Sequence, residues 1–302
     1  MRFRPVADAV ADALFCKYMS AATGKIVLAN RTLRWSTPGT LNDPYDTQFD
    51  LHVEVDRANV RALALKKLWE AHYGEQPGPV GNLLGAIIHS FRDVFPRLSR
   101  EEFDREFGEP IDLALADGEK AMPQTLAEVR TIMADSKLLC LTTQPDHPLM
   151  WSHYADSHRG VVLRFKAVEG LDSPWIVAKP VNYVANMPRL LDDEFLSEIM
   201  SGRATLHPTT LIDRMVYTKS DVWAYEKEWR ICAGAGRNHN AAFEDIPFAQ
   251  SELDSAILGC RMSPADQASL VELTRRLYPH ARIFVIEQSG KEFQFLVKPW
   301  PL

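Results

Sequence analysis

Hydrophobic periodicity changes twice along this chain, and this double change restricts the fold more than any other feature of the sequence. Residues 32–37 and 47–55 alternate apolar and polar side chains, as half-buried strands do. Residues 57–135 repeat apolar side chains at helical spacing, and strand-like segments follow. We therefore expect one α+β domain over residues 1–302, with a mixed, mostly antiparallel sheet formed by both chain ends and a helical insertion at residues 57–135.

Local signals predict where these elements begin and end. Ser99 and Glu102 form a capping-box pattern, which predicts the start of a helix. Gly78-Pro79 and Pro110 predict breaks in the helical insertion, because proline interrupts the backbone hydrogen bonds of a helix. The strand candidates in the second half of the chain are residues 138–142, 161–165, 175–183, 225–232, 256–260 and 283–286.

Composition and charge exclude several classes of protein. The 302 residues are 46% apolar and 25% charged, which is enough apolar material for a sizeable core. The net charge of −6 excludes a sequence-wide basic field for nucleic acid, whereas a local basic patch stays open. The four cysteines lie far apart, without zinc-binding or disulfide spacing, so we interpret them as reduced core thiols.

The beginning of the chain bears on its location. Asp8 and Asp12 interrupt the apolar stretch that follows Arg2 and Arg4, which is not the pattern of a signal peptide. No apolar run approaches the length of a membrane span. We therefore expect a cytoplasmic protein with no membrane partner.

The segment from Trp151 to Gly160 combines aromatic side chains with histidines. If it is a helix that Gly160 ends, Trp151, Tyr154 and His158 share one face. His153 then lies on another face, so the two histidines are poorly placed to bind one metal ion. We interpret His158 as a hydrogen-bonded core histidine. His153 is either an acid/base group oriented by a nearby carboxylate or part of a surface pair.

The predicted strand at residues 225–232 carries two acids. On a strand, Glu226, Glu228 and Arg230 point to one side, with the two carboxylates about 7 Å apart. Two acids repel each other unless a cation or a ligand lies near. The pair is therefore either a polar strand edge salt-bridged by Arg230 or an acid pair that binds a hydroxylated ligand or a metal ion.

Residues 42–46 predict a tight turn, because Asn and Asp side chains bond the nearby backbone and proline fixes φ. We interpret it as a capped turn, with a ligand-gripping loop as the alternative. We expect this turn, the Trp151 helix and the Glu226 strand to meet in one site, because all three combine aromatic with charged side chains.

Together these segments resemble a bacterial family of proteins of unknown function. Its members carry a Lys-Tyr pair, an Asn-Asp-Pro turn followed by an aromatic and an acid, the pattern MWxHYAxxHxG and the pattern WxYExEWR. The matching residues here are Lys17-Tyr18 and residues 41–46, 150–160 and 223–230, so the resemblance covers nearly the whole chain. It implies a bacterial protein but no particular reaction.

The chain also resembles ADP-ribosyltransferases, which carry a basic or aromatic residue on a first strand, a Ser/Thr strand next and a Glu-x-Glu pair on a later strand. The corresponding residues are Lys17-Tyr18, Trp35-Ser36-Thr37 and Glu226-x-Glu228. The resemblance implies that Glu228 stabilises the positive charge that develops as the glycosidic bond of NAD breaks. It implies that Glu226 mainly positions the acceptor.

The site residues of this hypothesis form two groups. The predicted catalytic residues are Glu228, Glu226 and His153. The residues predicted to bind NAD, which would be a substrate, are Lys17, Tyr18, Ser36, Asn42, Asp43, Tyr154 and Arg230. The acceptor would be a protein or a nucleic acid, and no residue is assigned to a metal ion.

Two other functions stay open. One is a non-catalytic sensor or interaction domain, in which the aromatic side chains serve only as core. The other is a metal-dependent hydrolase or nuclease, in which an acid cluster holds Mg²⁺ against a phosphate. Its ligands would come from Asp43, Asp46, His153, Glu226 and Glu228.

Overall fold

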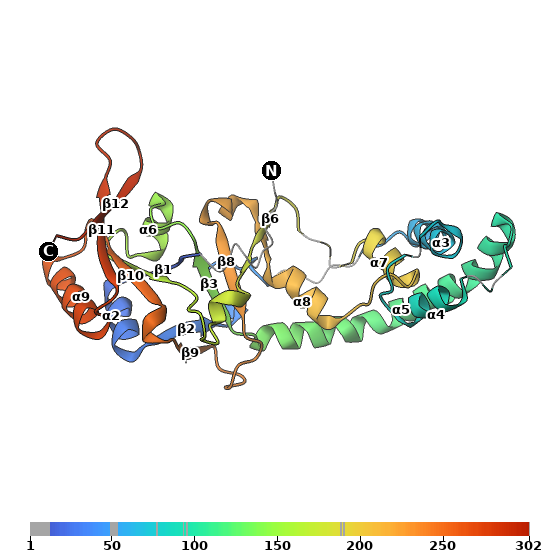
Figure 1. The fold of residues 1–302 in the computed structure, drawn as a ribbon, viewed down its shortest axis with the longest axis horizontal. Helices are drawn as coiled ribbons and strands as arrows, with labels where there is room; N and C mark the ends of the chain where they lie inside the picture. Colours follow the sequence, from blue (N-terminus) through green and yellow to red (C-terminus); the bar gives the residue numbers. More distant parts are fainter. Residues whose placement is uncertain are drawn as a thin grey trace. The chain divides into compact units, whose positions relative to one another are not determined.

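The structure, a computed structural model, describes residues 13–48 and 54–301 apart from residues 77, 93, 95, 188 and 190. It is an α+β fold, as the sequence predicts (Figure 1). The strands are β1 (Phe15–Met19), β2 (Thr32–Ser36), β3 (Leu138–Thr142), β4 (Val161–Phe165), β5 (Lys179–Pro180), β6 (Asn182–Val184), β7 (Thr218–Ser220), β8 (Glu228–Cys232), β9 (Phe243–Pro247), β10 (Leu253–Leu258), β11 (Arg282–Gln288) and β12 (Phe295–Pro299). The α-helices are α2 (Ala21–Asn30), α3 (Arg57–Tyr73), α4 (Leu83–Phe91), α5 (Arg100–Asp135), α6 (Pro148–Tyr154), α7 (Asp193–Met200), α8 (Pro208–Val216) and α9 (Pro264–Leu277). The 3-10 helices are η1 (Pro38–Thr40), η2 (Pro174–Val177), η3 (Asp221–Glu226) and η4 (Gln250–Glu252).

The chain divides into two compact units. The first consists of the described residues of Met1–Gln48, Met133–Asn186 and Val216–Leu302. The second consists of those of Phe49–Ile132 and Met187–Met215. The single α+β domain that we expect from the sequence stays a prediction.

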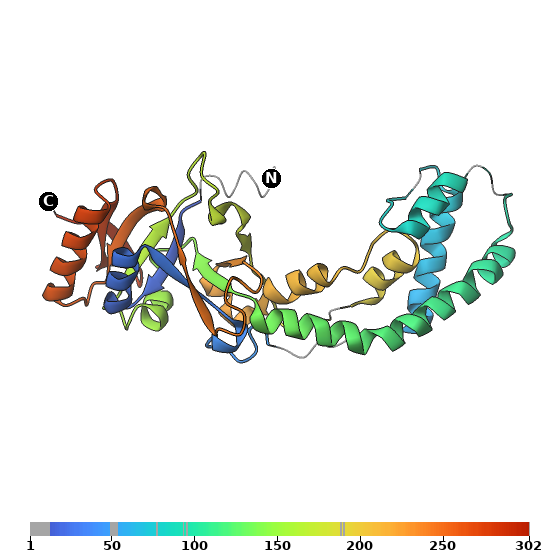
Figure 2. The same ribbon diagram turned by 90° about the horizontal axis from the view of Figure 1, so that it is seen from below.

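The first unit is built on one mixed sheet. The strand order is β12-β11-β10-β4-β1-β3-β2-β9, and β8 and β5 continue outward from β3. Only β10 and β11 run parallel in this sheet as described, so it is mostly antiparallel, as predicted. Strand β2 from the start of the chain, in blue, lies beside β9 from its second half, in orange (Figure 2).

Helices cover both faces of the sheet. Phe15 and Met19 of β1 belong to a buried cluster that includes residues of α2 and α9, the two helices that lie together in Figure 1. The alternate β1 residues, Cys16 and Tyr18, belong to a second cluster with Trp151 of α6. The period-two alternation of β1 thus places one set of side chains on each face.

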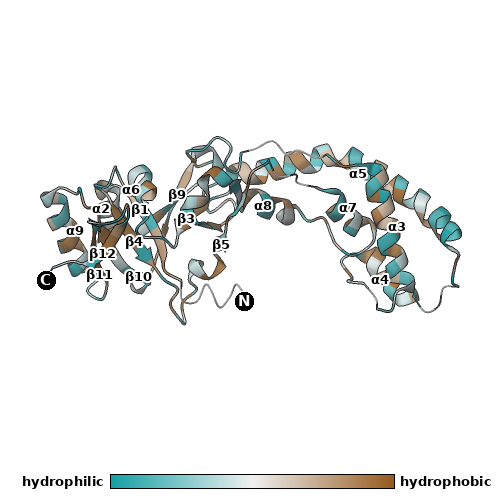
Figure 3. Ribbon diagram, turned by 90° about the horizontal axis from the view of Figure 1, so that it is seen from above, coloured by the Kyte–Doolittle hydropathy of each residue, from teal (hydrophilic) through white to brown (hydrophobic). Residues whose placement is uncertain are grey.

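The second unit is helical. Helices α3, α4 and α5 begin at Arg57 and end at Asp135, which confirms the predicted helical insertion. Figure 3 shows teal and brown residues on each of these helices, as expected where one face is buried. The capping box is present: the Ser99 N–H donates to Glu102 Oε2 at 2.9 Å, and the Glu102 N–H donates to Ser99 Oγ at 3.3 Å.

The predicted break at Pro110 is wrong, because α5 continues through Pro110 and also through Pro123. Helix α5 tolerates Pro110 because Ile111 and the partly buried Phe107 pack into the core of the second unit. The break at Gly78-Pro79 is confirmed, because α3 ends at Tyr73 and α4 begins at Leu83.

Two predicted strands have different outcomes. Most of residues 47–55 lies outside the described residues, and Thr47 and Gln48 belong to a turn. The continuous strand predicted at residues 175–183 is wrong, because η2 replaces its beginning and β5 and β6 are short pieces that pair with different strands. Pro180 explains the interruption, since proline has no N–H for a strand ladder.

No helix in the part of the chain that the structure describes is long and apolar enough to cross a membrane.

Candidate functional site

The sheet forks at β3. Strand β1 pairs with β3 only between Cys16 and Thr142, and β2 pairs with β3 only between Ser36 and Leu138. The opposite edge of β3 pairs with β8 along its whole length. Strands β1 and β2 therefore leave the same edge of β3 at different points, and a gap opens between them.

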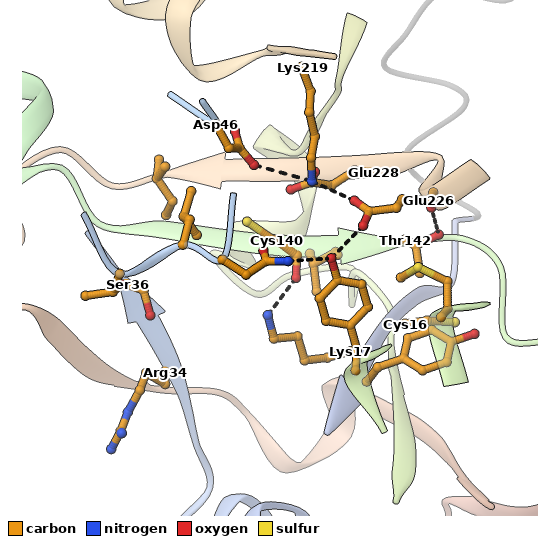
Figure 4. Close-up of a pocket in the computed structure, with 18 residues that line it drawn as sticks. Cys16, Lys17, Arg34, Ser36, Asp46, Cys140, Thr142, Lys219, Glu226 and Glu228 are labelled. Atoms are coloured by element: carbon orange, nitrogen blue, oxygen red, sulfur yellow. Dashed lines mark hydrogen bonds and ion pairs between the residues drawn. The ribbon is translucent and has the colours of Figure 1, made fainter. Parts of the chain in front are cut away.

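The middle of β3 faces this gap. The Cys140 carbonyl accepts a hydrogen bond from Lys17 Nζ at 2.8 Å, in place of a strand N–H (Figure 4). A cavity of about 260 Å³ occupies the fork, and residues of β1, β2, β3, α6, β7, η3 and β8 line it. The predicted site residues that line it are Lys17, Tyr18, Ser36, Asn42, Tyr154, Glu226 and Glu228.

Tyr154 joins the three segments that the sequence predicts to meet. Its hydroxyl donates to Glu226 Oε1 at 2.6 Å and accepts from Asn42 Nδ2 at 3.3 Å. The turn after β2, the end of α6 and the end of η3 are therefore connected through one hydroxyl group (Figure 4). This contact confirms that the three segments meet.

Lys219 of β7 is the central cation of the site. Its ammonium lies 2.7 Å from Glu226, 2.9 Å from Glu228 and 3.3 Å from Asp46. None of these four side chains is more than 5% exposed. Figure 4 shows the three carboxylates around this ammonium. The arrangement offsets the repulsion that three buried acids would otherwise have.

Arg230 is the second cation, and it is fully buried. Its Nε and Nη2 donate to the two carboxylate oxygens of Glu228 at 2.7 and 2.9 Å. Nη2 also donates to Asp46 Oδ2 at 2.7 Å, and Nη1 donates to the Val216 carbonyl at 2.8 Å. This fork-to-fork geometry is the strong form of an Arg–carboxylate pair.

The environments of the two glutamates push their pKa values apart. Burial raises the pKa of Glu226 above its ordinary value, although Lys219 and the hydrogen bond from Tyr154 act in the other direction. Burial alone would also raise the pKa of Glu228, but Arg230 and Lys219 lower it to about 2. Burial would lower the pKa of the Lys219 ammonium, but the three acids raise it well above its ordinary value. Near neutral pH, Glu228 is therefore a permanent anion and Lys219 a permanent cation.

The continuous strand predicted at residues 225–232 is wrong in its first half. Glu226 ends η3, Lys227 has a left-handed backbone with φ of 44°, and β8 begins at Glu228. Glu226 and Glu228 therefore do not share one strand face by alternation. They converge because both bind Lys219, a tertiary contact that the local pattern does not contain.

Neither of the two predicted histidines, His153 and His158, lines the cavity. Helix α6 ends at Tyr154, not at Gly160, because Asp156, Ser157 and His158 have φ of 47°, 50° and 70°. His153 is exposed and does not line the cavity. His158 packs on the Phe295 ring with the ring centroids 5.3 Å apart, and its buried Nδ1 has no partner among the described residues, so the hydrogen bond predicted for a core histidine is not found there.

The polar atoms of the Asp43 and Tyr18 side chains are occupied by hydrogen bonds within the protein. Asp43 Oδ1 accepts from the Tyr45 N–H at 2.9 Å and Oδ2 accepts from Trp223 Nε1 at 2.7 Å, so this carboxylate holds the turn and does not line the cavity. Tyr18 lines the cavity, and its hydroxyl donates to the Gln144 carbonyl at 2.7 Å.

Lys219 is the main site residue that the sequence does not reveal. It lies in a three-residue strand, seven positions before Glu226, and no periodic pattern connects them. Asp46 was assigned only to the metal hypothesis, and its role as a partner of Arg230 was also missed. The one signal in the sequence was the excess of acids over cations in the segments that we expected to meet.

The carboxylates of the metal hypothesis do not form a coordination sphere. Of Asp43, Asp46, His153, Glu226 and Glu228, three converge, and they converge on Lys219. Within the described ranges, no group of three or more His, Cys, Asp or Glu side chains is arranged to hold a metal ion.

Comparisons with known proteins give one match. Residues 150–231 match the model of a family described as a protein of unknown function (DUF2971). The matched range contains Tyr154, Lys219, Glu226, Glu228 and Arg230, and it ends one residue before the end of β8. No curated protein and no solved structure is significantly similar to the chain.

Proposed function

We propose that the protein is an ADP-ribosyltransferase-like enzyme, which cleaves the bond between nicotinamide and ribose in NAD and transfers ADP-ribose to a macromolecule. The observation that carries the proposal is the cavity at the fork of β1 and β2. Lys17 of the first strand, Ser36 of the second and both acids of the Glu-x-Glu pair line this one cavity. These are the three elements in which the sequence resembles that class of enzyme.

The size of the cavity limits which part of NAD it can hold. Its volume of about 260 Å³ is slightly below the ~300–1,000 Å³ typical of small-molecule sites. It therefore suits one end of a dinucleotide better than the whole molecule. We assign the nicotinamide and its ribose to the cavity, because cleavage takes place between them.

The contacts of the two acids favour Glu226 as the carboxylate that faces the ligand. Both oxygens of Glu228 accept from Arg230, and Oε2 also accepts from Lys219. Glu226 accepts one hydrogen bond at each oxygen, from Tyr154 and from Lys219. Since a carboxylate has about four acceptor positions, Glu226 keeps capacity for a ligand. This assignment differs from the sequence hypothesis, in which Glu228 has the leading role.

The reaction needs a negative charge beside the ribose. As the bond from C1′ to the nicotinamide nitrogen breaks, its electron pair leaves with nicotinamide and positive charge develops on the ribose. A fixed carboxylate stabilises that charge without reorganisation. The acceptor then forms a bond to C1′ and loses a proton, for which Glu226, with its raised pKa, is a suitable base. His153 has no part in this scheme, since it does not line the cavity.

The test is nicotinamide release from NAD, followed by transfer of ADP-ribose to protein and nucleic-acid acceptors. Glu226→Gln keeps the size of the side chain but removes the charge, and it should lower turnover by at least about 100-fold, the effect typical of a lost electrostatic contact in a transition state. Glu228→Gln should also lower turnover, but with a clear loss of thermal stability, because it leaves Arg230 poorly paired. Exposed Glu169→Gln is the matched control and should leave both properties unchanged.

A second candidate is a non-catalytic sensor. It is favoured by the fact that Lys219 and Arg230 already neutralise much of the acid cluster. NAD that binds to the wild type without any nicotinamide release would support the sensor and refute the enzyme. Wild-type protein that neither binds nor cleaves NAD would refute both the enzyme and an NAD sensor.

A further inference from the structure

One oxygen of the acid cluster has no hydrogen-bond partner among the described residues. Asp46 is 3% exposed, and its Oδ2 contacts Arg230 at 2.7 Å and Lys219 at 3.3 Å. Its other oxygen, Oδ1, is buried without a hydrogen-bond partner in the described part of the chain, although Asp46 lines the cavity. Buried polar atoms of native proteins are almost always hydrogen-bonded, so such an acceptor indicates a missing donor.

The surrounding charges restrict what this donor is. Three carboxylates and two cations, Lys219 and Arg230, meet here. An anionic group would be repelled by the three acids, and a second ammonium beside Lys219 would be repelled by that cation. A neutral hydroxyl group donates a charge-assisted hydrogen bond to Oδ1 without either repulsion.

A second acceptor lies on the other side of the same ammonium. Lys219 contacts both Asp46 and Glu226, and Glu226 keeps free acceptor positions besides those used by Tyr154 and Lys219. Asp46 and Glu226 thus flank one cation, and each carboxylate keeps an acceptor position that no described donor fills. Two neighbouring hydroxyl groups on one ring would satisfy both.

We propose that the cavity recognises a vicinal diol of a sugar, with one hydroxyl donating to Asp46 Oδ1 and the other to Glu226. The inference deepens the proposed function and rests on it for the identity of the sugar as ribose. It adds Asp46, which the sequence hypothesis did not assign to NAD, as a residue that determines specificity for the sugar.

The experiment measures binding by calorimetry, so that it does not depend on catalysis. The probe is the carbocyclic analogue of nicotinamide riboside, whose nicotinamide cannot leave by way of an oxocarbenium ion, together with its 2′-deoxy and 3′-deoxy forms. For the wild type, removal of either hydroxyl should weaken binding about tenfold, the usual effect of losing a hydrogen bond to a charged group. Asp221→Asn, a substitution of an exposed acid close to Lys219 in sequence, is the control variant. Its binding should weaken about tenfold when either hydroxyl is removed, as for the wild type.

Asp46→Asn is the decisive variant. Its amide can point the oxygen at Arg230 and Lys219, which puts an NH₂ donor at the position of Oδ1. The variant should therefore bind the parent probe more weakly than the wild type does. It should bind one of the two deoxy probes as tightly as it binds the parent probe. Asp46→Glu keeps the charge but displaces the carboxylate, and it replaces Asp46→Asn if that protein does not fold.

Two outcomes would overturn the inference. If both deoxy probes bind the wild type as tightly as the parent, or if no probe binds, Oδ1 is served by a water molecule only. If Asp46→Asn and Asp46→Glu keep the full discrimination against both deoxy forms, Asp46 does not contact the ligand. Probe binding that depends on the diol, without NAD cleavage, would refute the transferase and leave this inference standing. NAD cleavage without any dependence of binding on the diol would refute this inference and leave the transferase standing.

Discussion

Asp46 and Arg230 lie 184 residues apart in the chain, and Arg230 Nη2 donates to Asp46 Oδ2 at 2.7 Å with 0% and 2% of the two side chains exposed. This buried ion pair connects the turn that follows β2 with β8, the strand on the opposite edge of β3. Both walls of the cavity therefore depend on a contact that water does not screen.

Removing the Arg230 charge should destabilise the protein far more than removing a surface arginine. Arg230→Met leaves Glu228 and Asp46 without their main partner inside the protein, which costs about 3–5 kcal/mol for a buried pair. Arg34→Met is the control, because Arg34 pairs with Asp245 at the surface and should cost at most about 1 kcal/mol. Urea denaturation measures the unfolding free energy of each variant. Equal losses of unfolding free energy in Arg230→Met and Arg34→Met would contradict the prediction.

The stability contributed by Glu228 should disappear in acid. Its pKa is lowered from 4.5 to about 2, so its contribution is complete above about pH 4.5 and is lost as the pH falls towards 2. The difference in unfolding free energy between the wild type and Glu228→Gln should therefore shrink by roughly 3 kcal/mol over this range. The control Glu169→Gln, a substitution of an exposed side chain, should change the unfolding free energy by at most about 0.5 kcal/mol. A constant difference for Glu228→Gln would contradict the assigned ion pairs.

Tyr154 should set the pH at which Glu226 becomes active. Tyr154→Phe removes a donor that favours the charged form of Glu226, so the pKa of Glu226 should rise further above its ordinary value. The acidic limb of the profile of kcat against pH for NAD cleavage should move to higher pH, and kcat at neutral pH should fall at least about tenfold. Tyr45→Phe alters a tyrosine that is 66% exposed and should leave the profile unchanged.

Cys16 and Cys140 should resist alkylation in the folded protein. Burial raises the pKa of each thiol to about 12, so the reactive thiolate is scarce near pH 8. Mass spectrometry after iodoacetamide treatment should find both sites largely unmodified under native conditions and fully modified in denaturant. Equal labelling in the two states would show that the fold does not protect these thiols.

Much of the architecture follows from local patterns. Residues 138–142 and 161–165 were predicted as strands, and the structure has β3 and β4 with these bounds. Short apolar runs of this length favour buried strands. Two errors of prediction involve proline: α5 passes through Pro110, where a break was predicted, and Pro180 interrupts the continuous strand predicted at residues 175–183. At Pro110 the packing of α5 outweighs the local preference, whereas at Pro180 the missing proline N–H interrupts the strand ladder.

The candidate site was predicted in part. The motif residues Asn42, Tyr154 and Glu226 do meet, and the mixture of aromatic and charged side chains was the signal. Lys219 was not found, because a single lysine between a helix and an aromatic segment has many ordinary explanations on a protein surface. Only its burial among three acids distinguishes it.

The sequence by itself determined the α+β class, the helical insertion and the identity of seven residues that line the cavity, because periodicity and turn chemistry act over a few neighbouring positions. The tertiary structure decided which acid is neutralised and which stays available. That distinction depends on the positions of Lys219 and Arg230 relative to Glu226 and Glu228, set by the pairing of β8 with β3 and by the left-handed backbone at Lys227. Electrostatic energies depend on distance and burial, and neither is encoded in the spacing of residues along the chain.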